Sequence, residues 1–101
     1  MEGYREAIEQ ILGNKLKRMI LYGSYARGDF KQDSDLDIMI LADIQTEEVG
    51  NYSDRIYDVT YDFEVKYGME INPVIQSIQI YEQWKNAYPV FRNIEKDGVA
   101  V

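Results

Sequence analysis

Two strand-like segments stand close together in the sequence, and the short link between them limits how the chain can fold. Residues 17–22 end in an apolar run, and residues 35–41 alternate acidic residues or Met with Leu36, Ile38 and Ile40. The link is too short to hold a full crossover helix, which a parallel pair of neighbouring strands needs. A sheet that contains both strands is therefore expected to mix parallel and antiparallel pairs.

Helical patterns surround these strands. An apolar stripe at helical spacing stops at Gly13, and a longer stripe stops at Gly68. Thr46, followed by two glutamates, is expected to begin that longer helix. We predict a single α/β domain over residues 1–101, with a small mixed sheet of about three or four strands packed by helices. The expected elements are strands over 17–22, 35–41 and 69–76, and helices over 4–12, 46–67, 77–84 and 89–97.

The composition excludes several kinds of chemistry. The chain has no cysteine, which excludes disulfides, thiolate nucleophiles and cysteine zinc sites, and no histidine, which excludes Ser-His-Asp triads. Carboxylates, hydroxyls, amines and guanidinium groups are left, and a metal bound by them would be magnesium or manganese. No apolar run approaches the roughly 18 residues of a membrane span, and the N-terminus does not resemble a signal peptide. We therefore expect a cytoplasmic protein with no membrane partner.

The charge balance bears on partners. Eighteen acidic residues against eleven basic ones give a net charge of −7. Nucleic-acid binders usually carry the opposite sign, because neutralising phosphates supplies most of their affinity. Small nucleotides or proteins are thus favoured as partners over nucleic acid. The same net charge is equally compatible with a role in solubility alone.

Asp35 and Asp37 are the candidate metal ligands. They lie two residues apart on an expected strand, so both side chains project from one face, about 6–7 Å apart along the chain. Two carboxylates so close repel each other when ionised, and a divalent cation relieves that repulsion. A pair of metals about 3.5–4 Å apart fits such a pair and can hold the attacking and leaving oxygens of a phosphoryl transfer.

The segment Gly23-Ser24-Tyr25-Ala26-Arg27-Gly28 is the candidate phosphate loop. Gly23 lets the backbone turn sharply and lets a phosphate approach without a Cβ in the way. If residues 24–27 form a helical turn, their N–H groups point at that phosphate, and Ser24 adds a hydroxyl. Arg27 either contacts the phosphate or pairs with Asp29 or Asp33. The candidate nucleotide-binding residues are Gly23, Ser24, Arg27 and Gly28.

Two other kinds of loop have a similar residue spacing. Asp33, Asp35 and Asp37 have the spacing of a calcium loop, but Ile38 and Ile44 occupy the positions that require Gly and Glu. Gly23 and Gly28 have the spacing of a Walker A loop, but Asp29-Phe30 follows where Lys and Ser or Thr are required. Both interpretations fail. On chemistry alone, a third interpretation is still possible, in which the segment is a glycine turn followed by a solvated acidic strand end with no ligand.

At these residues the chain resembles the minimal nucleotidyltransferases of the DNA polymerase β-like superfamily. Their signature is Gly-Ser, a short helix with Ala-Arg-Gly, and then Ser-Asp-hydrophobic-Asp-hydrophobic, all of which occur in order within residues 23–40. The resemblance implies that Ser24 contacts nucleotide phosphates and that Asp35 and Asp37 bind magnesium. It also implies that a nucleoside monophosphate is transferred from a triphosphate with release of pyrophosphate, and we expect AMP from ATP.

The sequence departs from the family pattern at the third carboxylate. Family members generally carry it on the next strand, as base for the attacking hydroxyl. Asn72 stands where an Asp is expected, so Glu70, on the same strand face, is the candidate base, unless it is only an exposed strand-end acid. Pro73 donates no ladder hydrogen bond, so the strand is either an edge strand or bulged there.

The resemblance also suggests a protein partner. Small members of the family commonly pair with a helical HEPN-type toxin, and either transfer AMP to a toxin tyrosine or hold the toxin inactive. A second copy or another protein is expected to complete the cleft, in a homo- or hetero-oligomer. Nine tyrosines and one tryptophan fit an interface, although helical spacing favours core packing for most of them. An inactive relative that acts as a protein-binding antitoxin module is the alternative to an enzyme.

Overall fold

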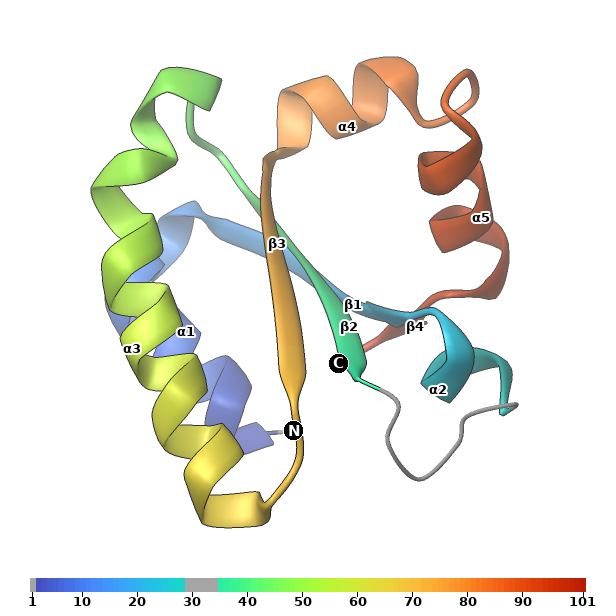
Figure 1. Ribbon diagram of the computed structural model, residues 1–101. Coiled ribbons are helices and arrows are strands. Elements are labelled where there is room, and N and C mark those ends of the chain that lie inside the picture. Colours follow the sequence, from blue (N-terminus) through green and yellow to red (C-terminus); the bar gives the residue numbers. More distant parts are fainter. Residues whose placement is uncertain (1, 29–34) are drawn as a thin grey trace.

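The computed structural model describes residues 2–28 and 35–101, in which helices cover a small sheet (Figure 1). The strands are β1 (Leu16–Tyr22), β2 (Leu36–Ala42), β3 (Ile71–Ser77) and β4 (Val99–Ala100). The α-helices are α1 (Glu2–Leu12), α2 (Ser24–Arg27), α3 (Gly50–Tyr67), α4 (Ile78–Trp84) and α5 (Pro89–Asp97), and the 3₁₀ turns are η1 (Gly13–Lys15) and η2 (Thr46–Glu48). None of the helices in these two ranges combines the length and the apolarity that crossing a membrane requires.

The sheet has four strands in the order β3-β2-β1-β4. β1 runs antiparallel to both β2 and β4, whereas β2 and β3 are parallel. The predicted mixed α/β sheet is therefore confirmed. β4 was not predicted. It pairs with Ile20 and Leu21 in the C-terminal part of β1, and the Val101 N–H beyond it donates to the carbonyl of Met19 over 3.0 Å.

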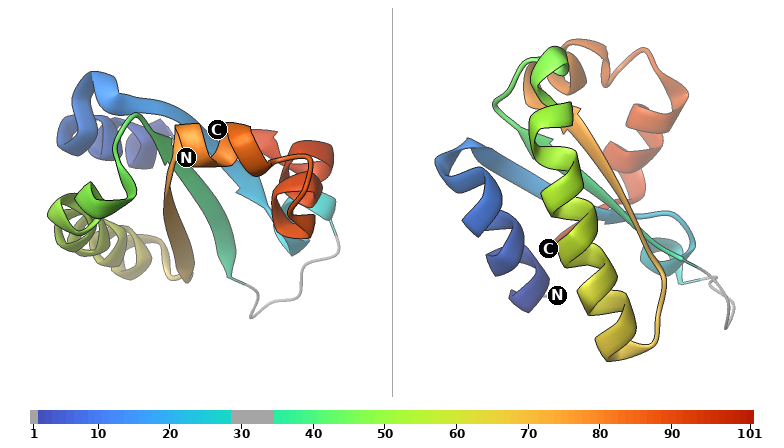
Figure 2. Two further views of the ribbon diagram at one scale, coloured as in Figure 1. Left: turned by 90° about the horizontal axis from the view of Figure 1, so that it is seen from above. Right: turned by 60° about the vertical axis from the view of Figure 1, so that its left-hand side comes forward.

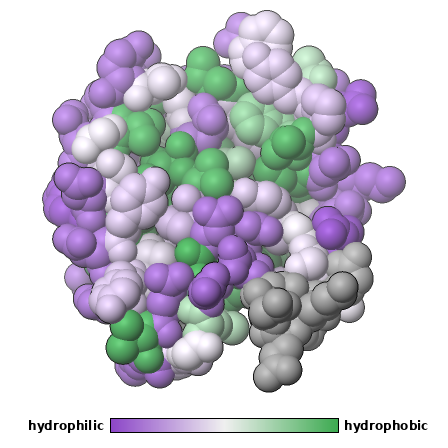
Figure 3. Space-filling model, viewed as in Figure 1, coloured by the Kyte–Doolittle hydropathy of each residue, from purple (hydrophilic) through white to green (hydrophobic). Residues whose placement is uncertain are grey.

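Helices cover both faces of the sheet (Figure 2). One core cluster joins α1 and α3 to Leu36, Ile38 and Ile40, and the other joins α4 and α5 to Met39 and Leu41. β2 is thus buried on both faces, because consecutive side chains of a strand point to opposite sides. In the view of Figure 1, apolar surface gathers between the helices, with hydrophilic surface toward both edges (Figure 3).

Two element boundaries differ from the prediction. The longer helix does not begin at Thr46: η2 comes first, the Gln45 N–H donates to the Glu48 carboxylate over 2.9 Å, and α3 begins at Gly50. The third strand begins at Ile71 and not at residue 69, because Gly68 ends α3 in the left-handed conformation and the chain must first turn back. Glu70 consequently lies just before the strand on which it was expected.

Pro73 lies in an edge strand, which confirms one of the two explanations given for it. Within residues 2–28 and 35–101, β3 pairs only with β2, in an unbroken register from Ile71 to Ser77. The Ile71 N–H points away from β2 and donates to the Glu64 carboxylate over 2.9 Å. The nitrogen of Pro73, two residues later, therefore faces the same open edge, where no ladder hydrogen bond is lost.

A buried hydrogen bond between α1 and α3 gives a test of the packing. The Thr60 hydroxyl donates to the Ile56 carbonyl over 2.7 Å, so the Tyr4 hydroxyl donates to Thr60 Oγ1 over 2.6 Å. We expect Thr60→Val to lower the free energy of unfolding in urea by about 1–3 kcal/mol, because it leaves a buried hydroxyl without its acceptor. The double variant Tyr4→Phe/Thr60→Val should lose less unfolding free energy than the two single variants lose together. Strictly additive losses would contradict a direct interaction between Tyr4 and Thr60.

Candidate active site

Gly23 packs its backbone directly against the carboxylate of Asp37. Tyr22, the last residue of β1, lies opposite Asp37 in β2, and Gly23 turns the chain with φ +78° and ψ −153°. That conformation is essentially limited to glycine. A Cβ on Gly23 would also lie 2.5 Å from Asp37 Oδ2. Only glycine therefore allows the candidate phosphate loop and the candidate metal ligand to meet in this way.

Asn72 fixes the other side of the Asp37 carboxylate. It lies opposite Asp37 in the parallel pair of β2 and β3, and its Nδ2 donates to Asp37 Oδ1 over 3.1 Å. One carboxylate oxygen thus faces Asn72 and the other faces Gly23. Asp37 lies two residues before Met39, which packs against α4 and α5, so the site opens on the α4/α5 face of the sheet.

Asp35 and Glu70 each lie just before the first residue of their strands, two residues before Asp37 and Asn72 respectively. Asp35 is exposed and precedes β2, on the same face as Asp37 by strand alternation. The Leu36 N–H donates to the Glu70 carbonyl over 2.9 Å, so continuing the register by one residue brings Glu70 opposite Asp35. Glu70 lines a shallow hollow beside the C-terminal end of α3. Asn72, and not Glu70, is the direct neighbour of Asp37.

The loop after Gly23 forms the single helical turn that the sequence predicts. Within it, the Arg27 N–H donates to the Gly23 carbonyl over 3.1 Å, which leaves the first N–H groups of the turn without an intrahelical acceptor. Ser24 is the first residue of the turn, next to Gly23. Gly28 ends the turn with φ +81°, and Arg27 is exposed beside it. Asp29, Phe30 and Asp33, named in the sequence analysis, lie outside the described residues.

The donor atoms of the site suit a hard cation. Asp35 and Asp37 offer carboxylate oxygens, and the described residues contain no group of three acidic side chains arranged to hold a metal. Magnesium is commonly held by one or two carboxylates, with water and substrate phosphates as its other ligands, so this pair fits it. Burial raises the pKa of the Tyr22 hydroxyl, and the negative charge of Asp37 raises that pKa further.

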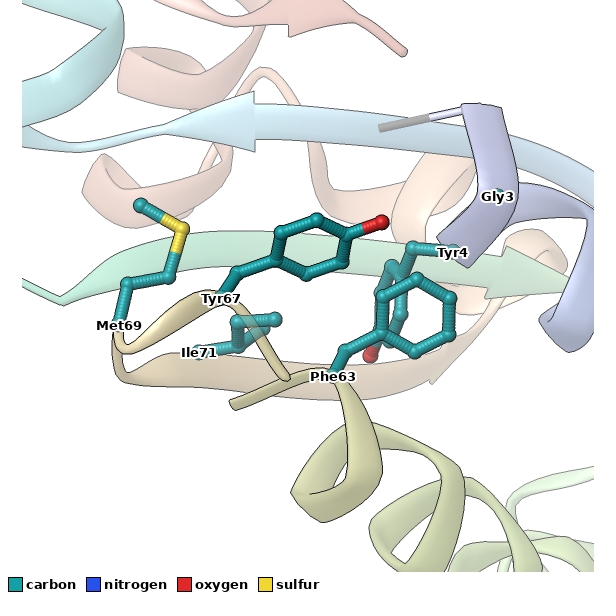
Figure 4. Close-up of a pocket in the computed structure, with 6 residues that line it drawn as sticks. All are labelled: Gly3, Tyr4, Phe63, Tyr67, Met69 and Ile71. Atoms are coloured by element: carbon teal, nitrogen blue, oxygen red, sulfur yellow. The ribbon is translucent and has the colours of Figure 1, made fainter. Parts of the chain in front are cut away.

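A cavity lies on the face of the sheet opposite to the one on which Asp37 opens. Its volume is about 380 Å³, and its walls come from α1, α3 and the start of β3 (Figure 4). Tyr67 stacks on Phe63 there, with ring centroids 5.8 Å apart. The cavity lies among the side chains of the α1/α3 cluster, so it is separated by the sheet from the face on which Asp37 opens.

Sequence comparison agrees with this geometry. The family model described as "Nucleotidyltransferase domain" matches residues 1–96. Two proteins of Methanocaldococcus jannaschii, each named "Putative protein adenylyltransferase", are similar to the chain. The first is 32% identical over 92 residues, which are 91% of this chain and 84% of that protein. The second is 36% identical over 72 residues, which are 71% of either chain.

A solved structure shares the fold. It is described as "Crystal structure of the toxin-antitoxin with AMP-PNP", has a TM-score of 0.57 at 18% identity, and covers 98% of this chain and 70% of that chain. The family match, the two relatives and the shared fold thus agree with the resemblance found in residues 23–40. The chain belongs to the nucleotidyltransferase domain family and is an adenylyltransferase-like member of it.

Proposed function

We propose that the chain transfers AMP from ATP to a hydroxyl acceptor, in a reaction that depends on magnesium. The observation that carries this proposal is the contact of the Gly23 backbone with the Asp37 carboxylate, which Asn72 holds from its other side. A phosphate at the loop and a cation at the carboxylate would then be neighbours. That juxtaposition is what phosphoryl transfer requires, since its catalysis rests on positioning and charge stabilisation.

Asp35 and Asp37 would hold the cation, either Mg²⁺ or Mn²⁺. Such a cation supplies positive charge against the phosphate oxygens. Gly23 and Ser24 hold the triphosphate through backbone N–H groups and a hydroxyl, with Arg27 and Gly28 at the other end of the turn. The Asn72 amide keeps the Asp37 carboxylate in one orientation, so that its second oxygen stays on the Gly23 side.

The acceptor hydroxyl oxygen attacks the α-phosphorus. A new P–O bond forms there, and the bond between the α-phosphorus and the bridging oxygen breaks. Pyrophosphate leaves with the electron pair of that bond. Glu70, which the register brings opposite Asp35, accepts the hydroxyl proton.

Substitution of the proposed base tests this last role. We expect Glu70→Gln to lower the rate of AMP transfer by about 10²–10⁴-fold, the usual contribution of general base catalysis. Glu47→Gln, an exposed change elsewhere, is the matched control. A wild-type rate in Glu70→Gln would remove Glu70 from the mechanism.

Label transfer tests the proposed reaction itself. The purified chain is incubated with α-labelled ATP, magnesium and lysate from its source, and protein-bound label is measured. We expect label on an acceptor, released pyrophosphate, and loss of both when a chelator removes divalent cations. Label that persists in excess chelator would contradict the dependence on magnesium. Absence of label together with absence of ATP binding would contradict the transferase proposal.

For the acceptor we propose a tyrosine of a helical HEPN-type toxin. The resemblance to minimal nucleotidyltransferases supports this, and the structural neighbour is a toxin–antitoxin complex with an ATP analogue by its own description. The labelled protein would be identified by mass spectrometry, with AMP on a tyrosine. Label confined to serine or threonine, or to RNA, would contradict this acceptor.

A second candidate function is neutralisation of a partner by contact alone. Asn72 replaces the third acid beside Asp37, and α3 exposes an outer face with aromatic side chains. Tyr57, Tyr61 and Val65 are 52%, 65% and 66% exposed at successive helical turns. Three exposed aspartates flank them on the same side of the helix, Asp54, Asp58 and Asp62. If this function is the right one, partner binding will not depend on magnesium or on Asp35 and Asp37.

A further inference from the structure

A cavity of about 220 Å³ adjoins the candidate phosphate loop on the α4/α5 face of the sheet. One wall is formed by Tyr22 at the end of β1, by Gly23 and by Arg27 of α2, and the other wall is α5. Gly23 therefore belongs both to this cavity and to the contact with Asp37. A molecule whose phosphates lie at Gly23 could extend into the cavity without crossing the sheet.

One part of the lining is apolar and suited to a flat ring. Tyr22 is half-buried, Ile94 is buried, and Val90 is 58% exposed at the mouth. Both Tyr22 and Ile94 pack into the α4/α5 core cluster, so these walls are held in place. An aromatic side chain that stacks on a nucleobase contributes about 1–3 kcal/mol, whichever base it is.

The other part of the lining is polar. Asn93 and Asp97 lie one turn apart on α5, and both line the cavity. The Asn93 amide can donate and accept hydrogen bonds. The Asp97 carboxylate accepts them, as an acidic residue does from ribose hydroxyls in dinucleotide-binding folds. The same carboxylate repels phosphates, so the nucleoside end of a nucleotide is favoured beside α5, whereas the positively charged Arg27 lines the opposite wall.

The position of Asp97 in α5 is electrostatically unfavourable for a carboxylate. Asp97 is the last residue of α5, at the helix end where the macrodipole is negative and a carboxylate is unfavourable. The cavity is also smaller than the roughly 300 Å³ at which pockets for whole ligands begin. This volume fits a cavity that takes one part of a larger ligand.

We propose that this cavity holds the nucleoside half of the nucleoside triphosphate, with the base against Tyr22 and Ile94 and the ribose hydroxyls on Asp97. The proposal rests on the proposed function, because it assigns the triphosphate to the adjoining loop. It adds α5 to the nucleotide site and gives this helix a part in substrate binding.

Calorimetry in magnesium tests the assignment with three probes: ATP, 2′,3′-dideoxy-ATP and inorganic tripolyphosphate. We expect Asp97→Ala and Asn93→Ala each to weaken ATP binding by about tenfold, the effect of roughly 1.4 kcal/mol. Tripolyphosphate binding should be unchanged or tighter in Asp97→Ala, because a negative charge has been removed. The wild type should prefer ATP to dideoxy-ATP, and Asp97→Ala should lose that preference. Glu6→Ala is the matched control, an exposed acid on α1.

The outcomes separate this inference from the proposed function. ATP binding that does not change in either α5 variant would overturn the inference alone. An equal loss of ATP and tripolyphosphate binding would also overturn it, because the effect would then lie on the phosphates. A wild-type chain that binds neither probe would overturn the proposed function, and the inference with it. Circular dichroism of each variant verifies that α5 is intact.

Discussion

Replacing Asp35 and Asp37 together by asparagine is expected to lower AMP transfer by at least about a thousandfold. A cation at such a site stabilises the transition state by several kcal/mol, and each 1.36 kcal/mol corresponds to about a tenfold change in rate. Neutral amides hold magnesium far more weakly than carboxylates do. The measurement is the initial rate of label transfer from α-labelled ATP at saturating magnesium.

The fold of this double variant should be intact. Asparagine at position 37 keeps a carbonyl oxygen as acceptor for the Asn72 amide, and two mutually repelling charges are removed. The free energy of unfolding without metal should thus be unchanged or slightly higher. Glu6→Gln/Glu47→Gln is the control, because it removes the same net charge from exposed positions elsewhere. Wild-type transfer by the aspartate variant would contradict the proposed role of this pair.

Gly23→Ala is expected to lower both activity and stability. The added Cβ would lie 2.5 Å from Asp37 Oδ2, so the carboxylate or the loop has to move. The backbone conformation of Gly23 adds a cost of about 1–3 kcal/mol for any other residue. We expect the rate of transfer to fall by about a hundredfold or more, since a displacement of about 1 Å at a reacting centre has that effect.

Gly68→Ala separates the cost of the backbone conformation from the effect of the clash with Asp37. Gly68 has φ +68°, but an added Cβ there meets no atom within 4 Å. This variant should lose only about 1–2 kcal/mol of unfolding free energy, the cost of a left-handed non-glycine residue, and should retain its activity at a temperature at which it is folded. Gly23→Ala with unchanged activity would show that the contact between the loop and Asp37 is dispensable.

The parts of the site that depend on local sequence could be predicted. The turn at residues 24–27 follows from glycine chemistry, and it is found. The shared face of Asp35 and Asp37 follows from strand alternation and stays a prediction. Helical periodicity likewise predicted the helices of the α1/α3 cluster. Predicting these features does not require knowing which distant segments of the chain are in contact.

Contacts between distant segments could not be predicted in the same way. The bond from Asn72 to Asp37 depends on the register of β3 against β2, and the sequence of β3 alone does not contain that register. The α5 wall of the smaller cavity depends on how the C-terminal helix packs over β1. The strand β4 is two residues long, too short for a period to be recognised. Tyr22 could have been found, because it is the last strand residue before Gly23.

The open edge of β3 has a consequence for how the protein avoids association. An unpaired strand edge is a template on which another chain can add a strand. Here the Ile71 N–H is already bound by Glu64, and Pro73 has no N–H to offer. The edge of β3 thus lacks two neighbouring N–H donors for an incoming strand. Both positions lie next to the end of the sheet that carries Asp37 and Asn72. The segment beside the site can therefore stay accessible to substrate without becoming a seed for aggregation, and Pro73→Ala should promote aggregation more than it changes stability.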